Sequence, residues 1–132
     1  METKLERVKT CPFCQVSFQM SSESYGENIL VVRDLNPVAP GHRLIVPRDH
    51  YESLLEISTA LVSALFQVAV EVGRKVVSDG ADGFNLGVNN GVSAGQSVRH
   101  LHIHVIPRAI GDVEDAFGGL RGVIPAKRRY DT

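Results

Sequence analysis

The sequence predicts a single α+β domain in which a mostly antiparallel sheet packs against one long helix. Short β-branched segments precede and follow one long segment of helical periodicity, and this order is typical of an α+β domain. The chain has 132 residues, which is the usual size of one domain with its own hydrophobic core. We therefore expect residues 1–132 to fold as one unit.

Four segments are predicted to be strands. The first, 29–32, is a β-branched run, and the second, 42–46, stops at Pro47. Between them, the turn-rich segment 34–41 predicts a loop. The third strand, 84–88, and the fourth, 98–106, flank a glycine-rich loop at 89–95. The fourth alternates apolar residues with histidines, so its apolar side chains should face the helix and its histidines the opposite side.

The long helix is predicted to begin after Ser58, a residue type favoured at the N-cap, and to end at Asp79 and Gly80. Its apolar stripe at helical spacing consists of Leu61, Leu65, Phe66, Val68, Ala69, Val72 and Val76. A short helical turn is expected at 51–55. The glycine-rich tail, 109–132, has a charged end and is expected to form an extended arm.

The composition argues against several functional classes. The chain carries 14 basic and 15 acidic residues, a net charge of −1, so no large field attracts nucleic acid or an anionic membrane. No apolar run has membrane length, and the start, METKLERVKT, lacks the apolar core of a signal peptide. We expect a cytoplasmic protein, with no nucleic-acid or membrane partner, whose Cys11 and Cys14 are reduced.

Three histidines carry the main chemical signal. His100, His102 and His104 alternate with apolar residues, and residues two apart in a strand point the same way. A row of imidazoles can supply nucleophiles, acid–base groups or metal ligands near neutral pH. A solvated row without function is the competing interpretation, and strict alternation beside a glycine-rich loop disfavours it.

The loop before the histidines, 89–97, suits phosphate binding. Glycines let the backbone approach an anion and present its N–H groups, and Asn89, Gln96 and Ser97 add neutral donors. An ordinary tight turn would need Gly91 or Gly95, but not the amides and the hydroxyl. Coupled to the histidine row, the loop predicts a phosphate-handling site.

The sequence resembles the histidine-triad superfamily. The triad signature appears as His100-Leu-His102-Ile-His104-Val-Ile and extends upstream through Gly95-Gln-Ser-Val98. A second block, Asp34-Leu-Asn-Pro-Val-Ala-Pro-Gly-His42-Arg-Leu-Ile-Val-Pro-Arg-Asp-His50, also matches in order and spacing. The motif-bearing core is 11–108. The resemblance implies a five-stranded, mostly antiparallel sheet with one long and one short helix, and a homodimer with a continuous sheet.

The resemblance also implies a role for each matching residue. His102 is the nucleophile that attacks the α-phosphate, between His100 and His104, and His104 contacts the phosphate. The positions that hold phosphate oxygens and the leaving group are Asn89, Gly95, Gln96, Ser97 and Val98. Asp34 matches the position that binds the ribose hydroxyls. The candidate walls of the base pocket are Leu30, Val32, and Leu44 or Val46.

These roles predict a nucleotidyl hydrolase or transferase that passes through a covalent nucleotidyl-histidine intermediate and requires no catalytic cofactor. The expected substrate is an adenine or other purine nucleotide. The residues Gln96-Ser-Val98, with Pro107-Arg108, resemble diadenosine-polyphosphate hydrolases. Adenosine 5'-phosphoramidate hydrolases also carry Gly-Gln-Ser-Val, so both substrates stay open.

The pair Cys11-Pro-Phe-Cys14 has the spacing of a zinc knuckle, but two thiolates make only half a tetrahedral site. Related triad proteins close such a site with a downstream histidine and the first triad histidine, which implies His50 and His100 here. We therefore expect a structural zinc. Two free cysteines or a redox pair remain the alternatives. His42 is the other candidate for the fourth ligand, but we expect it to form hydrogen bonds near the loop instead.

Two functions of other classes compete. His100, His102 and His104 could share one catalytic zinc, as in a three-histidine hydrolase. Alternatively, the chain could bind nucleotides without catalysis. Chelator sensitivity of turnover tests the first, and turnover of an adenosine phosphoramidate or a dinucleotide tests the second.

Overall fold

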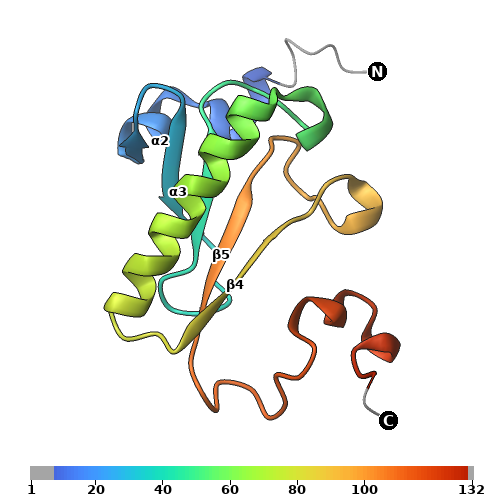
Figure 1. Ribbon diagram of the computed structural model, residues 1–132. Helices are drawn as coiled ribbons and strands as arrows, with labels where there is room; N and C mark the ends of the chain where they lie inside the picture. Colours follow the sequence, from blue (N-terminus) through green and yellow to red (C-terminus); the bar gives the residue numbers. More distant parts are fainter. Residues whose placement is uncertain (1–7, 131–132) are drawn as a thin grey trace.

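A five-stranded antiparallel sheet, ordered β1-β2-β3-β5-β4, forms the centre of the computed structural model, which describes residues 8–130 (Figure 1). The strands are β1 (Glu23–Tyr25), β2 (Ile29–Arg33), β3 (Arg43–Pro47), β4 (Gly83–Val88) and β5 (Ile103–Arg108). Every neighbouring pair runs antiparallel. The predicted α+β class and antiparallel sheet are confirmed, and β1 and β4 are the edge strands.

The helix α3 (Thr59–Ser78) crosses one face of the sheet (Figure 1). The predicted N-cap is confirmed, because Ser58 Oγ accepts a hydrogen bond of 3.1 Å from the backbone N–H of Leu61. Its buried residues pack against a set of sheet and pre-strand residues: Ile29, Val31, Ile45, Leu101, Ile103 and Val105. Each large side chain buried there contributes about 1.5–3 kcal/mol, so this layer is the main source of stability.

A second, smaller apolar cluster lies on the opposite face. The 3-10 helix η1 (Pro12–Cys14) and the helix α2 (Val16–Ser21) follow one another along the N-terminal segment. Cys11 and Phe13 pack there against Val32, Leu44 and Val46, three of the residues predicted to wall a base pocket. The N-terminal segment therefore brings both cysteines to the face that carries the histidines.

The fourth predicted strand starts later than expected, at Ile103 rather than at residue 98. In the register of β3 and β5, Ile45 pairs with Ile103. If the ladder continued by two residues, Leu101 would pair with Pro47. Proline has no N–H to continue the ladder. The N–H of Leu101 instead donates to the carbonyl of Tyr51, at 2.6 Å, and the chain before β5 follows this segment.

The sequence interpretation missed α2 and β1. Both are short, and their positions depend on distant side chains. Gln19 Nε2 donates to the carbonyls of Phe13 and Arg48, at 3.1 and 3.0 Å. The Arg48 guanidinium donates in turn to the carbonyl of Glu27 and to the hydroxyl of Ser24, which lies in β1. The short turn expected at 51–55 is the 3-10 helix η2 (Leu54–Glu56).

The C-terminal arm is folded into two 3-10 turns, η4 (Gly119–Val123) and η5 (Pro125–Lys127), and is not extended as expected. Arg128 forms an ion pair of 3.2 Å with Asp115 and also donates to its carbonyl. The guanidinium of Arg121 lies 4.9 Å from the centre of the Tyr130 ring. Arginine contacts between distant positions thus fold a segment whose glycines favour no regular element.

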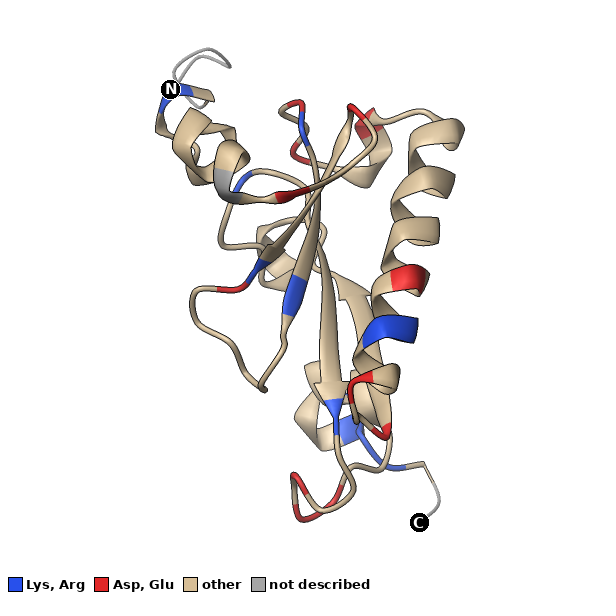
Figure 2. Cartoon of the chain, turned by 90° about the vertical axis from the view of Figure 1, so that its left-hand side faces the viewer, with Lys and Arg blue, Asp and Glu red and all other residues tan. Residues whose placement is uncertain are grey.

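Charged residues of both signs are interspersed along the chain (Figure 2), in keeping with the net charge of −1. Among residues 8–130, no helix has both the length and the apolar character needed to cross a membrane. The expectation of no signal peptide concerns the start of the chain, and residues 1–7 lie outside the described part.

Candidate active site and adjoining metal-ligand cluster

The histidine row occupies the sheet face opposite α3, as the alternation predicts. His104 lies in β5, whereas His100 and His102 lie in the segment just before it. The intervening Leu101 and Ile103 are buried in the helix-side core. His100 and His102 are themselves buried, which is rare for an unpaired polar group, so their hydrogen bonds decide their chemistry.

The ring of His102 is held by its own strand segment. Its Nδ1 lies 2.8 Å from the carbonyl oxygen of His100, and only an N–H at Nδ1 can bond a carbonyl. A neutral imidazole has one N–H, so Nε2 of His102 keeps its lone pair. The ring is flanked edge-on by Phe13 and His104, with ring centres 5.4 and 5.0 Å away. His102 is therefore set as a fixed imidazole whose Nε2 can act as a nucleophile or base.

A chain of hydrogen bonds fixes His104 in the opposite sense. The backbone N–H of Val38 donates to His42 Nδ1 at 3.2 Å, so His42 Nε2 carries the hydrogen. That Nε2 lies 2.9 Å from His104 Nδ1 and donates to it. The remaining hydrogen of His104 is then on Nε2, a buried atom with no hydrogen-bond partner among the described residues. His104 thus offers an unused N–H donor beside His102.

Burial lowers the pKa of His104 to about 4, with His102 and then His42 adding to the shift. Burial also lowers the pKa of His42, although the carboxylate of Asp34 opposes that shift. Both rings are consequently neutral near pH 7, as the hydrogen-bond chain requires.

Asp34 lies next to the hydrogen bonds that join Val38, His42 and His104. Its Oδ2 is 3.4 Å from His42 Nε2, and its Oδ1 accepts from the backbone N–H of Asn36 at 2.8 Å. Asp34, His42 and His104 have ligand atoms close enough to hold a metal. However, His42 Nδ1 accepts from Val38, so His42 Nε2 carries the hydrogen that it donates to His104 and has no lone pair for a metal. We interpret these residues as a proton-ordering chain.

The predicted phosphate loop connects β4 to the histidines. Gly91 and Gly95 have φ angles of +98° and +94°, and Val92–Ala94 forms the 3-10 helix η3 between them. Gly95 and Ser97 are exposed, and Asn89 is half-buried. The loop therefore presents the Ser97 hydroxyl at the surface, whereas the N–H groups of Ala94, Gly95 and Gln96 donate to carbonyls within the loop, at 3.0 to 3.1 Å.

Gln96 is engaged within the loop. Its Oε1 accepts from the N–H of Gly91 at 2.8 Å, and its Nε2 donates to the carbonyls of Glu52 and Val98, at 2.9 and 3.1 Å. Both amide hydrogens are thus directed to the backbone. The neighbouring Asn90, which the sequence interpretation did not single out, bonds to Ser53 and Leu54. A run of two asparagines before glycine was the only sequence signal for it.

The four predicted metal ligands come together in one cluster. The ligand atoms of Cys11, Cys14, His50 and His100 all lie within 4.8 Å of one another. Cys14 Sγ is 3.2 Å from His50 Nδ1 and 3.4 Å from His100 Nδ1. A sulfur and a nitrogen on one tetrahedral zinc are separated by about 3.6 Å, slightly more than these contacts, and two thiols with two imidazoles are a donor set typical of that metal.

The surroundings of this cluster also suit a cation. His100 Nε2 donates to the carbonyl of Pro47 at 2.7 Å, which leaves the Nδ1 lone pair directed at the cysteine sulfurs. Burial, followed by the neighbouring Cys11, raises the pKa of Cys14 to about 12, so this thiol keeps its proton unless a cation offsets the burial. Burial likewise lowers the pKa of His100 to about 4, so its ring is a neutral donor.

The same geometry argues against a shared zinc on the three triad histidines. His100 turns its Nδ1 to the cysteines, while His102 gives its Nδ1 hydrogen to a carbonyl. Two groups of described residues have ligand atoms spaced for a metal, and neither contains His102. The three histidines thus have different partners. His100 faces the cysteines, His102 bonds to a backbone carbonyl, and His104 bonds to His42.

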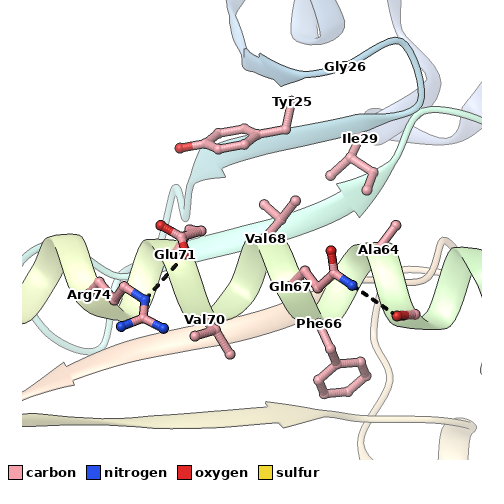
Figure 3. Close-up of a pocket in the computed structure, with 11 residues that line it drawn as sticks. Tyr25, Gly26, Ile29, Ala64, Phe66, Gln67, Val68, Val70, Glu71 and Arg74 are labelled. Atoms are coloured by element: carbon pink, nitrogen blue, oxygen red, sulfur yellow. Dashed lines mark hydrogen bonds and ion pairs between the residues drawn. The ribbon is translucent and has the colours of Figure 1, made fainter.

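A separate depression lies on the helix side, between α3 and β1 (Figure 3). Its lining includes Tyr25, Ile29, Ala64, Val68 and Glu71, and contains neither histidine nor cysteine. It therefore lacks the groups for the chemistry predicted above, and the candidate active site is the opposite face.

A small antiparallel α+β domain with a row of three histidines beside a glycine-rich loop defines the class of this protein. The chain belongs to the HIT family, because residues 24–110 match the HIT domain. The resemblance inferred from the two sequence motifs is thus confirmed.

Relatives in this family carry different names. The chain is 38% identical over 115 residues to an adenylylsulfatase of Arabidopsis thaliana, an alignment covering 84% of this chain and 58% of that protein. It is 37% identical over 110 residues to an AP-4-A phosphorylase of Mycobacterium tuberculosis, covering 76% of this chain and 55% of that protein. The chain thus spans little more than half the length of these two relatives.

Solved structures agree with the fold. A Zn-bound histidine triad family protein from Mycobacterium smegmatis superposes with a TM-score of 0.74 at 30% identity, covering 82% of this chain and 81% of that one. A HIT family member from Bacillus subtilis gives a TM-score of 0.69 at 33% identity, covering 77% and 74%.

Proposed function

We propose that this protein is a nucleotidyl hydrolase or transferase in which His102 attacks the α-phosphorus of an adenine nucleotide and forms a covalent nucleotidyl-histidine. The observation that carries the proposal is the 2.8 Å bond from His102 Nδ1 to the carbonyl of His100, which reserves Nε2 as a lone pair in a ring that belongs to neither metal-ligand group of the described residues. Membership of the HIT family supports the same assignment.

In the first step, the Nε2 lone pair forms a bond to phosphorus while the bond from phosphorus to the leaving group breaks. The leaving group departs with that electron pair and takes up a proton. Negative charge on the phosphoryl oxygens is stabilised by the unused Nε2–H of His104 and by the side chains of Asn89 and Ser97 in the 89–97 loop. Asp34 holds the ribose hydroxyls in this proposal.

In the second step, water attacks the phosphorus and the nitrogen–phosphorus bond breaks. The electron pair returns to Nε2 of His102, and the water's proton is released with the nucleoside monophosphate. Dividing one displacement into two easier ones is the gain from covalent catalysis. An alcohol, amine or phosphate in place of water would make the reaction a transfer.

The substrate class is open between a phosphoanhydride, such as a diadenosine polyphosphate, and a phosphoramidate, such as adenosine 5'-phosphoramidate. The relatives named adenylylsulfatase and AP-4-A phosphorylase both refer to adenylyl compounds, which supports adenine as the base. Because the leaving group differs while the attacked phosphorus does not, one site can serve each of these bonds.

Turnover assays test the function. The purified chain is incubated with diadenosine tetraphosphate, adenosine 5'-phosphoramidate and adenylyl sulfate, with and without a chelator. We expect release of AMP from at least one of the three, at a rate that a brief chelator treatment leaves unchanged. Absence of turnover with all three would favour a nucleotide-binding protein, and immediate loss on chelation would favour a metal hydrolase.

We further propose that a structural zinc ties the N-terminal segment to the catalytic segment through Cys11, Cys14, His50 and His100. A bound zinc would hold these four donors in place without entering the reaction. The two cysteines are free thiols, which suits a reducing cytoplasm. Elemental analysis should find about one zinc per chain after purification without chelator, and a value near zero would contradict the assignment.

We also propose a homodimer in which two β4 edges pair into one continuous sheet. Val70 and Val77 on α3 are 42% and 45% exposed, and Phe84 on β4 is 38% exposed. Phe66 and Val70 point away from Tyr25 in Figure 3, on the side of α3 toward β4 and β5. Sedimentation should give a dimer, and Val70→Asp with Phe84→Asp should give a monomer. A monomeric unmodified protein would refute the proposal.

A further inference from the structure

The phosphate loop is closed on itself by hydrogen bonds, because the N–H groups of Ala94 and Gln96 donate to the carbonyl of Gly91 and that of Gly95 donates to the carbonyl of Val92. Residues 92–95 are exposed, and the turn between Gly91 and Gly95 contains only one short 3-10 helix. Glycines at positive φ permit this turn, but they also give the unfolded loop the largest freedom to lose. These local bonds shape the turn but do not set where it lies relative to the histidines, so another part of the molecule must hold the loop in place.

Asn90 supplies such an attachment. Its Oδ1 accepts from the backbone N–H of Leu54 at 2.8 Å, and its Nδ2 donates to Ser53 Oγ at 3.2 Å. Ser53 is the N-cap of η2, and its Oγ also accepts from the N–H of Leu55 at 3.0 Å. The Asn90 carboxamide thus accepts from the N–H of Leu54 and donates to the hydroxyl of Ser53.

Gln96 closes the other end of the loop onto the same segment, through Nε2 and the carbonyl of Glu52 at 2.9 Å. We name residues 50–54 the strap. The strap is itself anchored where the N–H of Leu101 meets the carbonyl of Tyr51, and where His50 meets Cys14. One segment therefore touches the phosphate loop, the catalytic segment and the metal-ligand cluster.

We propose that Asn90 is a positioning residue that docks the phosphate loop on the strap and so holds Asn89 and Ser97 in place for contact with the phosphate. The loop's part in catalysis rests on the proposed function. The attachment of the loop to the strap rests only on the hydrogen bonds of Asn90. Asn90 touches no reacting atom in this scheme and acts through the placement of the 89–97 loop. A shift of about 1 Å in groups that contact the phosphate lowers turnover by as much as about 100-fold.

Two substitutions separate hydrogen bonding from bulk. Asn90→Ala removes both bonds and leaves the Leu54 N–H without its acceptor. Asn90→Asp keeps an oxygen for that N–H, and the Ser53 hydroxyl can donate to its second oxygen. Gln67→Ala is the matched control, because Gln67 Nε2 donates to Ser63 Oγ at 3.1 Å on the exposed surface of α3.

The experiment measures kcat and KM, hydrogen exchange of the amides of residues 91–96 without substrate, and thermal stability. Asn90→Ala should lower kcat about tenfold or more and speed the exchange, while Asn90→Asp restores most of both. The added charge of Asp should raise KM, so its rescue is judged on kcat at saturating substrate. Gln67→Ala should change neither.

Unchanged exchange and kcat in Asn90→Ala would overturn the proposal, as would an Asn90→Asp variant that is as impaired as Asn90→Ala. If the unmodified protein turns over no nucleotide, the proposed function fails. The exchange measurement would still decide whether Asn90 holds the loop.

Discussion

The two ends of the histidine row differ in every partner, although the sequence presents them as equivalent. His100 directs a lone pair at two cysteine sulfurs, 3.4 Å away, and donates its hydrogen to Pro47. His104 receives a hydrogen from His42 and keeps an N–H that no described residue accepts. One end is arranged to bind a cation and the other to donate to an anion.

His102 lies between these ends and takes its orientation from the first. The acceptor for its Nδ1 hydrogen is the carbonyl of His100, so the residue that faces the cysteines also fixes the tautomer of the candidate nucleophile. The position of a histidine in the row therefore does not determine its chemistry. The second nitrogen of each ring, and what it bonds, determines it.

The largest expected effect comes from removing the middle residue. His102→Ala should lower kcat by about 10⁴-fold or more, because no other group can form the covalent intermediate. Zinc content and fold should persist, as measured by elemental analysis and circular dichroism. A folded variant with near-normal turnover would show that the row has no unique nucleophile.

The next largest effects should differ between substitutions at the two ends of the row. His100→Ala should lose the zinc and much stability, about 4 kcal/mol where free zinc exceeds its Kd a thousandfold. His104→Ala should keep the zinc and lose about 100-fold in kcat, the usual range for one donor to a developing charge. Zinc content and denaturant unfolding compare the two variants. Equal zinc loss in both would contradict the division of the row.

A smaller effect is expected at His42, which acts on substrate only through His104. His42→Leu should reduce kcat about 10- to 100-fold with zinc unchanged, because the tautomer of His104 is no longer imposed. The pH profile of kcat should shift as well, since His42 contributes to the lowered pKa of His104. If neither kcat nor the profile changes, the proton-ordering chain has no catalytic role.

The smallest effect concerns stability against pH. The pKa of His104 is about 4 in the fold against 6.5 for the free side chain, so the unfolded chain binds more protons between these values. Stability from this residue is complete above pH 6.5 and is lost as the pH falls to about 4. For a half-buried ring screened by solvent, the loss is about 1 kcal/mol. In His104→Gln, the free energy of unfolding, measured with denaturant, should decline less between pH 6.5 and 4 than in the unmodified protein. An equal decline in both proteins would contradict this contribution of His104.

The sequence predicted which face each residue of the row occupies, because alternation between apolar and polar positions is a local property. It did not predict that the strand starts at Ile103, since that depends on Pro47 as its pairing partner. For the same reason it missed α2 and β1, which Gln19 and Arg48 hold by contacts between distant positions.

The candidate site shows the same limit. The triad and the Cys-x-x-Cys pair could be recognised as motifs, and the four-residue cluster they imply is present. The partners that set each ring nitrogen could not, because a backbone carbonyl or the N–H of Val38 leaves no trace in residue type. Asn90 was missed because its role depends on where the strap lies.

The most direct test of the account is to trap the intermediate and locate it. The protein is mixed with an adenylyl substrate at low temperature, quenched at alkaline pH, and digested after Arg99 and Arg108 to release a peptide with all three triad histidines. Fragmentation in the mass spectrometer should place the nucleotidyl group on His102 alone. A group found on His100 or His104, or on no histidine while turnover proceeds, would contradict the account.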